Sequence, residues 1–516
     1  MDGADRPAPN MTGPKASLSA RSSWSWTLVA LLFVALTTAL IAQRSAWWGP
    51  TWSLLTSGFW VGFVAVVVFK TICCLSPPAH PRSISPRPRR WPHYTLVAAL
   101  KDEADIVPQL IRRLARIDYP ARHLTGFLVV EPDDPTTLAA ILATPRPPWL
   151  VPLVAPPGTP QTKPRALNVA LQRAPAGLLT VYDAEDEPHP EQLKEAAVAF
   201  ASGGPDLACL QAPLQIRTLG RAATWLERQF AHEYAALFEV ILPAMVRMGL
   251  PIPLGGTSNH FRVDILKEVG GWDPWNVTED ADLGFRLTRR GYRIGTLSRP
   301  TRESPPSDFR AWLPQRTRWL KGFMQTISVN LRHPRDLGWG GVAALMLTLV
   351  AAVASATLQG PVLAWVLANL LIHGLNGTSP SFTVPHLALL VTGWLVAIWT
   401  VQIGVGRTAS RLSLLDALTS PLYWSLTSLA QVHAVWRLVF QPFHWDKTPH
   451  LPDLQEHTGS RRVLRNRASL PTLRVSPNQT TGPWKFSISK RTPTSAPASS
   501  SVIAPKTSRE CAPPDA

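Results

Sequence analysis

Three groups of acidic residues stand out in the middle of the chain: Asp133 and Asp134; Asp183, Glu185 and Asp186; Glu279 and Asp280. The second group follows directly after the apolar run Leu178–Tyr182, which delivers three carboxylates to one point. Such a concentration of negative charge repels itself unless a cation offsets it, and hard divalent cations prefer oxygen ligands. We therefore expect this group to hold a hard divalent cation, the kind of ion with which diphosphate substrates commonly arrive.

The other two groups also have simpler structural interpretations. Surface loops are rich in acids, so Asp133 and Asp134 taken alone are weak evidence for a site. Thr278 precedes Glu279 and Asp280 just before the helix expected over 282–290. In that position Thr278 would be the helix N-cap, and the two acids would complement the helix dipole.

The elements that must position these acids alternate between strand and helix. Tyr94–Leu100 (YTLVAAL) is a buried-strand pattern, and Gly126–Val130 and Leu178–Tyr182 are two further short strands. Apolar residues between 106 and 117 recur at the spacing of one helical face. The alternation predicts an α/β domain with a largely parallel sheet. Because ligands bind at the carboxyl ends of such strands, the acids that follow them should converge on one cleft.

The composition excludes a purely soluble single domain. The 516 residues carry 51 Lys+Arg and 34 Asp+Glu, a net charge of +17, but only 16% of them are charged. A soluble globular chain usually has about 25% charged residues. The segment Leu337–Gly406 contains no Asp, Glu, Lys or Arg at all. The four cysteines have neither a disulfide nor a zinc-ribbon spacing.

Apolar runs on both sides of the α/β segment predict membrane helices. Trp26–Ala42 and Trp52–Phe69 are each close to the ~20 residues that cross a bilayer, so we expect two transmembrane helices within 23–75. A cleaved signal peptide is the alternative for the first run, but the second run follows at once. Pro361 and the stretch 376–385 would divide the later region, 337–440, into three or four helices. We expect four to six helices in total, with six favoured.

The basic residues predict the orientation. The charges that follow the second run, without an acid among them, are Lys70, Arg82, Arg87, Arg89 and Arg90. Positive charge marks the cytoplasmic side, so residues 91–334 should form a cytoplasmic domain of a multi-pass protein in the inner (plasma) membrane. Arg407 and Arg411 conflict with this in a six-helix arrangement, unless 361–375 is interfacial.

The two ends of the chain read as disordered, over residues 1–22 and 457–516. The second of these is a basic tail rich in Ser, Thr and Pro. Attraction to anionic membrane lipids explains its charge more simply than a role with nucleic acid.

Taken together, the motifs resemble those of the family 2 glycosyltransferases, in the membrane-embedded, cellulose-synthase-like branch. The resemblance covers about two thirds of the chain. The matching segments are Lys101-Asp102-Glu103-Ala104, Glu131-Pro-Asp133-Asp134, Lys163-Pro-Arg-Ala-Leu-Asn168, Asp183-Ala-Glu185-Asp186, Leu254-Gly-Gly-Thr257-Ser-Asn259-His260, Thr278-Glu279-Asp280, Gln315-Arg316-Thr317-Arg318-Trp319 and Trp445-Asp-Lys-Thr-Pro-His450. Two departures stand out: the second metal-binding acid is Glu185 or is displaced to Asp186, and Leu451 replaces the glycine that ends the last motif.

The resemblance implies a GT-A-like nucleotide-sugar-binding domain with a mostly parallel sheet, and it implies a role for each motif. Asp280 would be the general base of an inverting transfer, with Glu279 as the second candidate. The residues that would bind the donor are Asp102 or Glu103, Asp133 or Asp134, and Lys163, with the metal on Asp183 and on Glu185 or Asp186. The residues that would serve the acceptor and the leaving diphosphate are Asn259, His260, Gln315, Arg316, Arg318 and Trp319.

The implied activity is transfer of a sugar, a hexose from a UDP donor, to a growing polysaccharide that the protein would also export, alone or with partner proteins. Transfer of a single sugar to a lipid acceptor is the alternative within the same chemistry. A non-catalytic membrane component with a degenerate enzyme fold is the alternative from another class, and the intact Asp183 and Asp280 argue against it. A transporter is disfavoured because the charge-free spans lack paired intramembrane ionisable residues.

Overall fold

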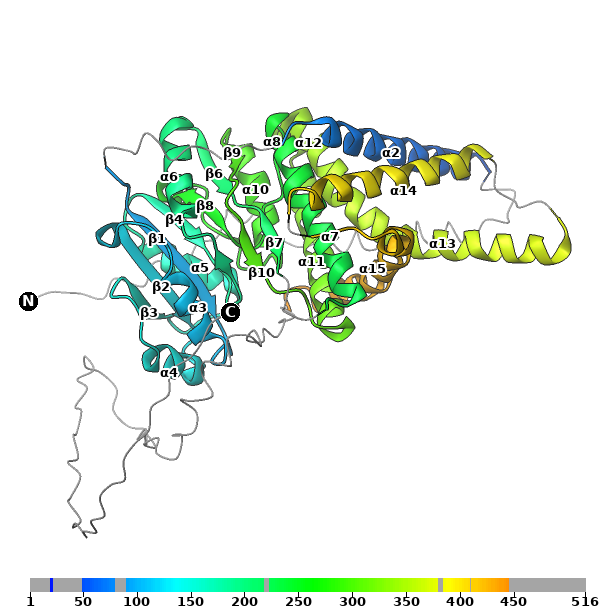
Figure 1. Ribbon diagram of the computed structural model, residues 1–516. Helices are drawn as coiled ribbons and strands as arrows, with labels where there is room; N and C mark the ends of the chain where they lie inside the picture. The colour runs from blue at the N-terminus through cyan, green and yellow to red at the C-terminus, as the bar shows by residue number, and fades with distance from the viewer. Residues whose placement is uncertain are drawn as a thin grey trace, which may run out of the picture. The chain divides into compact units, whose positions relative to one another are not determined.

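The computed structural model describes residues 19–21, 49–78, 90–217, 222–378, 384–408 and 410–444 (Figure 1). The expected membrane run Trp26–Ala42, the motif Trp445–His450 and the expected disordered ends, apart from residues 19–21, lie outside the described residues.

A seven-stranded sheet forms the centre of the catalytic region, in the order β3-β2-β1-β4-β8-β6-β9. All neighbouring pairs are parallel except those of β8, which runs antiparallel to both β4 and β6. This confirms the mostly parallel sheet predicted from the sequence. Its strands are β1 (Tyr94–Leu100), β2 (Leu124–Val130), β3 (Leu150–Val154), β4 (Leu178–Val181), β6 (Leu207–Gln211), β8 (Asn259–Arg262) and β9 (Arg293–Thr296).

The strand β1 is buried on both faces, which explains its unbroken apolar sequence. Leu96 and Leu100 belong to the apolar core on one side of the sheet, and Val97 belongs to the core on the other. Successive side chains of a strand point to opposite faces, so a strand covered on both sides needs apolar residues at every position. The helices of this region are α3 (Val107–Leu114), α4 (Pro135–Ala143), α5 (Lys163–Arg173), α6 (Gln192–Ser202), α9 (Val263–Glu268) and α10 (Glu279–Arg289).

A second sheet contains three short strands. The first of them, β5, comes directly after the acidic group that follows β4. This sheet has the order β5-β10-β7, with β5 at Glu187–Pro188, β7 at Leu214–Ile216 and β10 at Thr301–Glu303. Because β5 begins one residue after Asp186, the pairing of β5 with β10 fixes where the acidic turn ends.

Three segments are helical, long and apolar enough to cross a membrane, by length and composition, among the described residues. They are Ser57–Leu75 within α2 (Gly49–Leu75), Pro334–Asn376, and Val384–Val405, which is α14. One precedes and two follow the catalytic region, which confirms apolar helices on both sides of it. The last helix, α15 (Leu414–Phe440), packs along α11 (Phe309–Leu331).

The predicted division of the charge-free region at Pro361 is wrong. Residues 338–376 form one continuous run of α12 (Gly338–Leu345), a π-helical turn and α13 (Ala351–Asn376), with Pro361 inside it. A proline removes one helical hydrogen bond, and a neighbouring helix can satisfy the groups it frees. Next to this proline, the Ser428 hydroxyl of α15 accepts a hydrogen bond from the Gly360 amide at 2.9 Å, so α15 lies directly against the helix at this point.

The fusion of two expected spans also removes the conflict over Arg407 and Arg411. The Arg407 guanidinium donates to the backbone carbonyl of Glu239, and His232 lies 3.1 Å from the carbonyl of Arg411. Glu239 and His232 belong to the segment 225–247, which follows β7 in the catalytic region. Both arginines therefore lie against catalytic-region residues.

The start of α10 and the helix α11 approach each other closely at Gly322, and this close approach can be tested. A β-carbon at Gly322 of α11 would overlap the side chain of Thr278, whose own β-carbon would be 2.8 Å away. We expect Gly322→Ala to lower the free energy of unfolding by about 1–3 kcal/mol, because the two helices must separate. Gly374→Ala is the matched control, since that helix-interior glycine has open space around it. Thermal unfolding of both variants in detergent measures the difference, and equal melting temperatures would contradict the close approach.

Candidate active site

Three charged side chains from distant parts of the chain converge on the backbone at Gly256. A β-carbon at this glycine would lie 3.3 Å from Asp280 Oδ2, 3.8 Å from Lys163 Nζ and 4.0 Å from Asp183 Oδ2. Asp183 follows β4, Lys163 begins α5 and Asp280 lies in the first turn of α10. The structure therefore brings together Asp183, Lys163 and Asp280, three residues that the family resemblance implies for one site.

Lys163 is the cation at the centre of this group. Its ammonium forms an ion pair with the Asp183 carboxylate and donates a hydrogen bond to the Gly256 carbonyl at 2.7 Å. Burial alone would lower the pKa of Lys163, but the charges of Asp183, Glu279 and Asp280 outweigh it and raise the pKa. Lys163 therefore stays charged and supplies a fixed positive charge where a phosphate group could be neutralised.

The acidic turn after β4 contains one fully buried carboxyl group and two partly exposed ones. Asp186 is fully buried, and its Oδ2 accepts hydrogen bonds from the Asp183 amide at 2.7 Å and from the Thr257 hydroxyl. Burial and the neighbouring charges of Asp183 and Glu185 hold the pKa of Asp186 well above its usual range. Asp186 thus shapes the turn, whereas Asp183 and Glu185 remain partly exposed.

The donor set fits a divalent cation that also binds substrate. Among the described residues, no three His, Cys, Asp or Glu side chains gather as a site made of protein alone. Mg²⁺ typically takes one or two carboxylates and completes its shell with water and substrate phosphates. Asp183 and Glu185 offer those carboxylates, and the Asp186 Oδ1 atom is buried without a hydrogen-bond partner beside them.

The acid pair at the start of α10 has one buried and one partly exposed member. Glu279 is buried, and burial together with the charge on Asp280 raises the pKa of Glu279 to about 8. Burial also raises the pKa of Asp280, against the opposing effects of the Ala281 amide, Lys163 and Arg318. Because the charge on Asp280 is one cause of the raised pKa of Glu279, the two carboxyl groups titrate as a linked pair. At neutral pH the pair can carry one proton on Glu279 and a free carboxylate on Asp280.

Thr278 stands at the N-cap position of α10 but does not cap it with its side chain. Its hydroxyl lies 3.4 Å from Asn276 Oδ1 and 3.4 Å from the Thr326 hydroxyl of α11. Capping by Thr278 therefore does not explain the motif, and the contacts tie the acid pair to α11 instead.

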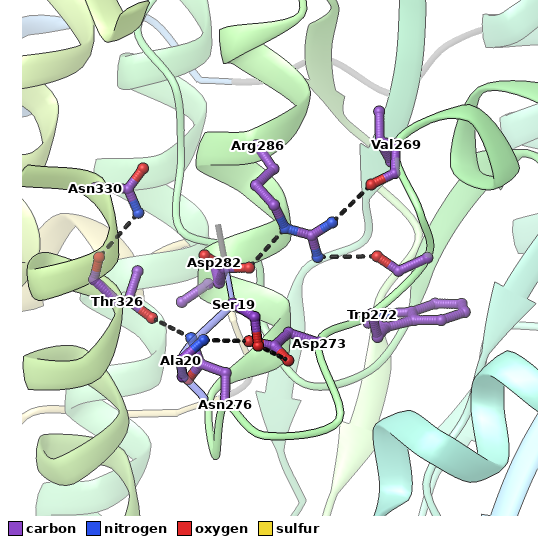
Figure 2. Close-up of polar contacts among 12 residues, drawn as sticks. Ser19, Ala20, Val269, Trp272, Asp273, Asn276, Asp282, Arg286, Thr326 and Asn330 are labelled. Atoms are coloured by element: carbon purple, nitrogen blue, oxygen red, sulfur yellow. Dashed lines mark hydrogen bonds and ion pairs between the residues drawn. The ribbon is translucent and has the colours of Figure 1, made fainter. Parts of the chain in front are cut away.

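The loop before α10 is held on several sides (Figure 2). The Asn276 amide donates to the Thr326 hydroxyl at 3.0 Å. Asp273 accepts hydrogen bonds from the Ala20 amide at 2.7 Å and the Ser19 hydroxyl at 3.0 Å, so the N-terminal residues 19–21 dock on this loop. These bonds fix the approach of the chain to Asp280.

Within α10, Arg286 anchors the helix to the preceding segment. Its guanidinium pairs with Asp282 at 2.6 Å and donates to the carbonyls of Val269 at 3.0 Å and Gly271 at 2.9 Å (Figure 2). Arg286 and Asp282 are buried together, so the helix that carries Asp280 cannot rotate without breaking these contacts.

On the expected nucleotide side, the loops after β1 and β2 are bonded to each other. Asp134 caps α4 by accepting from the Thr137 amide at 3.1 Å, and it also accepts from the Asp102 amide at 2.5 Å. These hydrogen bonds outweigh burial and lower the pKa of Asp134. Asp134 is buried, as is Glu103, whereas Asp102 and Asp133 are exposed. Asp102 has a positive φ of 51°, a backbone conformation that this cross-loop bond holds.

The expected acceptor residues of β8 lie inside the protein. His260 is fully buried between the Tyr94 hydroxyl, 2.5 Å from Nδ1, and Gln192, 3.2 Å from Nε2. Burial lowers the pKa of His260 to about 3, so the imidazole is neutral. Asn259 is also buried and donates to the Gly255 carbonyl at 2.5 Å. Asn259 thus supports the loop that carries Gly256, whereas His260 bridges Tyr94 of β1 and Gln192 of α6.

The residues of the motif Gln315–Trp319 on α11 have different surroundings. The Arg316 guanidinium is buried and paired with Glu233 of α7 (Trp225–Ala236). Arg318 is partly exposed, and its charge lowers the pKa values of Glu279 and Asp280. Gln315 and Trp319 are also partly exposed, and Trp319 packs against aromatic rings of α7.

Three residues that the sequence did not single out join the site and its surroundings: Glu233, Glu303 and Tyr423. Glu303 at the end of β10 is buried, and burial with the charges of Asp186, Glu185 and Asp183 raises its pKa well above normal. Glu303 ends a strand of three residues, and Glu233 and Tyr423 lie in long helices. None of them belongs to a recognisable motif, so only the fold reveals them.

Comparison with known proteins finds a matching family model and several similar proteins. Residues 178–402 match the family model described as "Glycosyl transferase family group 2". Beta-monoglucosyldiacylglycerol synthase of Synechocystis sp. is 26% identical over 302 residues, 57% of this chain and 60% of that protein. A UDP-forming cellulose synthase catalytic chain of Dictyostelium discoideum is 27% identical over 188 residues, 34% of this chain and 16% of that protein. The matches thus span less than two thirds of either relative.

Among solved structures, the mannosyltransferase PcManGT from Pyrobaculum calidifontis, in complex with GDP-Man and Mn²⁺, gives a TM-score of 0.49 at 16% identity, covering 75% of this chain and 97% of that one. The family match begins at β4 and includes the acidic turn, the acid pair and the α11 motif. The chain is thus similar to the family 2 glycosyltransferases over residues 178–402, it has apolar helices before and after its sheet region, and the proteins to which it is similar include a cellulose synthase.

Proposed function

We propose that the protein is an inverting hexosyltransferase that moves a sugar from a UDP-hexose to a growing polysaccharide at the membrane. The observation that carries the proposal is the convergence of Asp183, Lys163 and Asp280 on Gly256. A nucleotide-sugar transferase needs a cation at the departing diphosphate and a base at the acceptor, and these three side chains offer both within a few ångströms.

On the donor side, Asp183 and Glu185 would hold Mg²⁺ or Mn²⁺ against the diphosphate. The bound cation supplies Lewis-acid charge stabilisation to the leaving group. Lys163 adds its fixed ammonium, which offsets the negative charge that develops as the sugar departs. The exposed Asp102 and Asp133 are the acids placed to contact the nucleoside, with Asp134 and Glu103 behind them ordering the two loops. The cellulose synthase relative is described as UDP-forming, which supports UDP as the nucleotide.

On the acceptor side, Asp280 takes the proton of the attacking hydroxyl. A bond forms between that oxygen and the anomeric carbon, on the face opposite the diphosphate, while the bond to the diphosphate breaks and its electron pair leaves with the phosphate oxygen. Asp280 is suited to this role because Glu279 beside it holds a proton up to about pH 8. Arg318 adds positive charge near the acid pair, where it can meet the leaving diphosphate.

The proposed location is the inner membrane with the catalytic region in the cytoplasm, where nucleotide sugars would be bound. The basic residue Lys70 near the end of α2 and the contacts of Arg407 and Arg411 with catalytic-region residues support this orientation. Membrane lipids are then direct partners of the apolar helices, and export partner proteins are compatible with a polymer product.

Transfer of one sugar to a lipid is the second candidate, because the glycolipid synthase match extends over 57% of this chain against 34% for cellulose synthase. A screen of UDP-hexoses with Mg²⁺ or Mn²⁺ in detergent, followed by solvent extraction and sizing of radiolabelled product, separates the two. A ladder or insoluble chain supports the polysaccharide, and one lipid-soluble species supports the alternative. The absence of any sugar transfer from every donor would contradict the proposed function.

Asp280→Asn should abolish transfer, by at least about 100-fold, because an amide cannot accept the acceptor's proton. Binding of UDP should change by less than about twofold, since the substitution leaves Asp183 and Lys163 in place. Asp264→Asn is the matched control: Asp264 is an exposed acid in the first turn of α9 and should keep parental activity. Transfer by Asp280→Asn at the parental rate would show that another group is the base.

Glu279→Gln should remove a pH dependence of UDP binding. Glu279 is neutral below about pH 8 and negative above it, so in the parent the affinity for the anionic diphosphate should fall as the pH rises through 8. The variant keeps a neutral side chain throughout, and the ionisation of UDP itself is common to both proteins. Titration with a fluorescent UDP derivative from about pH 6 to about pH 9 measures this.

The same proton predicts a stability effect with a defined sign. The folded protein retains it between the usual pKa of 4.5 and about 8, whereas the unfolded chain releases it. The free energy of unfolding should therefore fall as the pH rises across this window in the parent, and it should depend less on pH in Glu279→Gln. Parallel profiles for the two proteins would contradict the assignment of the proton to Glu279.

A further inference from the structure

Arg316 joins three helices through a buried polar cluster. Its two terminal nitrogens pair with the two carboxylate oxygens of Glu233 on α7, at 2.6 and 2.7 Å. The Tyr423 hydroxyl of α15 donates to Glu233 at 2.9 Å and accepts from Arg316 at 3.2 Å. It also accepts from the Trp312 indole of α11 at 3.3 Å. We name these residues, Arg316, Glu233, Tyr423 and Trp312, the three-helix cluster.

The cluster is connected directly to the Trp319 side chain. The Arg316 guanidinium lies 4.6 Å from the centre of the Trp319 ring, a cation–π contact. Trp319 also lies near Phe230 and Tyr234 of α7, at centroid distances of 6.1 and 6.2 Å. The indole is thus held on α7 by the same residue that pairs with Glu233, and its orientation depends on that pairing.

The contacts of Arg316 leave little of its guanidinium group available to bind a diphosphate. Both terminal nitrogens are engaged by Glu233, and the side chain is only 8% exposed. Arg318, two positions further along α11, is the arginine whose charge acts on Glu279 and Asp280. Two residues along a helix are separated by about 200°, so the two arginines serve opposite sides of α11.

Further contacts join α7 and α15. The Arg228 guanidinium pairs with Asp416 at 2.9 Å, and the Trp225 indole, whose ring packs against that of Tyr423, donates to the Thr419 hydroxyl at 2.8 Å. The two helices therefore have a contact that survives when the cluster is altered. Weakening the cluster should change the geometry around Trp319 without separating the helices.

We propose that Arg316 is a positioning residue for the acceptor: through Glu233 and Tyr423 it fixes Trp319 relative to α7 and α15, and it does not bind the donor diphosphate. This inference rests on the proposed function and on the acceptor role that the family resemblance implies for Trp319. It gives the two arginines of the motif different roles. Arg316 positions Trp319 for the acceptor, and Arg318 binds the diphosphate.

The variants must be conservative, because removing one partner of a buried ion pair leaves an uncompensated charge that can unfold the protein. Arg316→Lys keeps the charge but cannot form the paired hydrogen bonds. Glu233→Gln keeps the shape, and Tyr423→Phe removes only a hydroxyl. Arg310→Lys is the matched control, since Arg310 is exposed on the same helix.

The test measures UDP binding and sugar transfer separately, on the full chain in detergent. In Arg316→Lys and Glu233→Gln we expect the dissociation constant of a fluorescent UDP derivative to stay within about twofold, while transfer at low acceptor concentration falls about tenfold. The double variant should be no worse than the poorer single, because both changes break one cluster. Tyr423→Phe should show the same pattern more weakly, and Arg310→Lys should match the parent. Arg318→Lys should instead weaken UDP binding.

Intact UDP binding also reports that the variants are folded. The proposal is overturned if Arg316→Lys weakens UDP binding about tenfold while Glu233→Gln does not, because Arg316 would then be a diphosphate ligand. It is also overturned if all cluster variants keep parental transfer. A parent protein that binds UDP but transfers no sugar to any acceptor would instead refute the proposed function, and this inference would fall with it.

Discussion

The structure depends on holding like charges together. Asp183 and Asp280 are far apart in the chain, yet both point at Gly256 beside a single ammonium, that of Lys163. Their mutual repulsion would open the site if the elements that carry them were free to move. The sheet holds the first, because Asp183 follows the central strand β4, and α11 holds the second through the loop before α10. A bound cation would offset this repulsion, and a diphosphate would bind through that cation.

The helix α11 connects that chemistry to the apolar helices. One side of it contacts the loop before the acid pair, through Thr326, and another meets α7 and α15 through Arg316. Its Lys321 donates to the carbonyl of His444 just after α15, at 2.6 Å. The positions of Asp280 and of the helices that pack on α11 are therefore set by one element. The proposed transfer to an acceptor at a membrane would need such a connection.

Sequence alone predicted the parts of the fold that rest on local patterns. The strand Tyr94–Leu100 is found with the bounds expected, because a strand buried on both faces must be apolar throughout. The meeting of Asp183 and Asp280 was expected from the family resemblance, which implies roles for both residues in one site. Pro361 was misjudged because the sequence does not show that a neighbouring helix packs against it, where Ser428 accepts a hydrogen bond from the Gly360 amide. The sequence also did not predict the different roles proposed for Arg316 and Arg318. The role of Arg316 depends on its pairing with Glu233, which is 83 residues away in the chain.

The central claim is that one cation site and one base face each other across Gly256. A structure of the full chain with UDP and Mn²⁺, determined by electron microscopy or crystallography, tests it directly. The account predicts a metal ion bound by the Asp183 carboxylate at about 2 Å and by the diphosphate, with Asp280 open toward the same cavity. A metal bound elsewhere, or an Asp280 carboxylate turned away from the nucleotide, would contradict it.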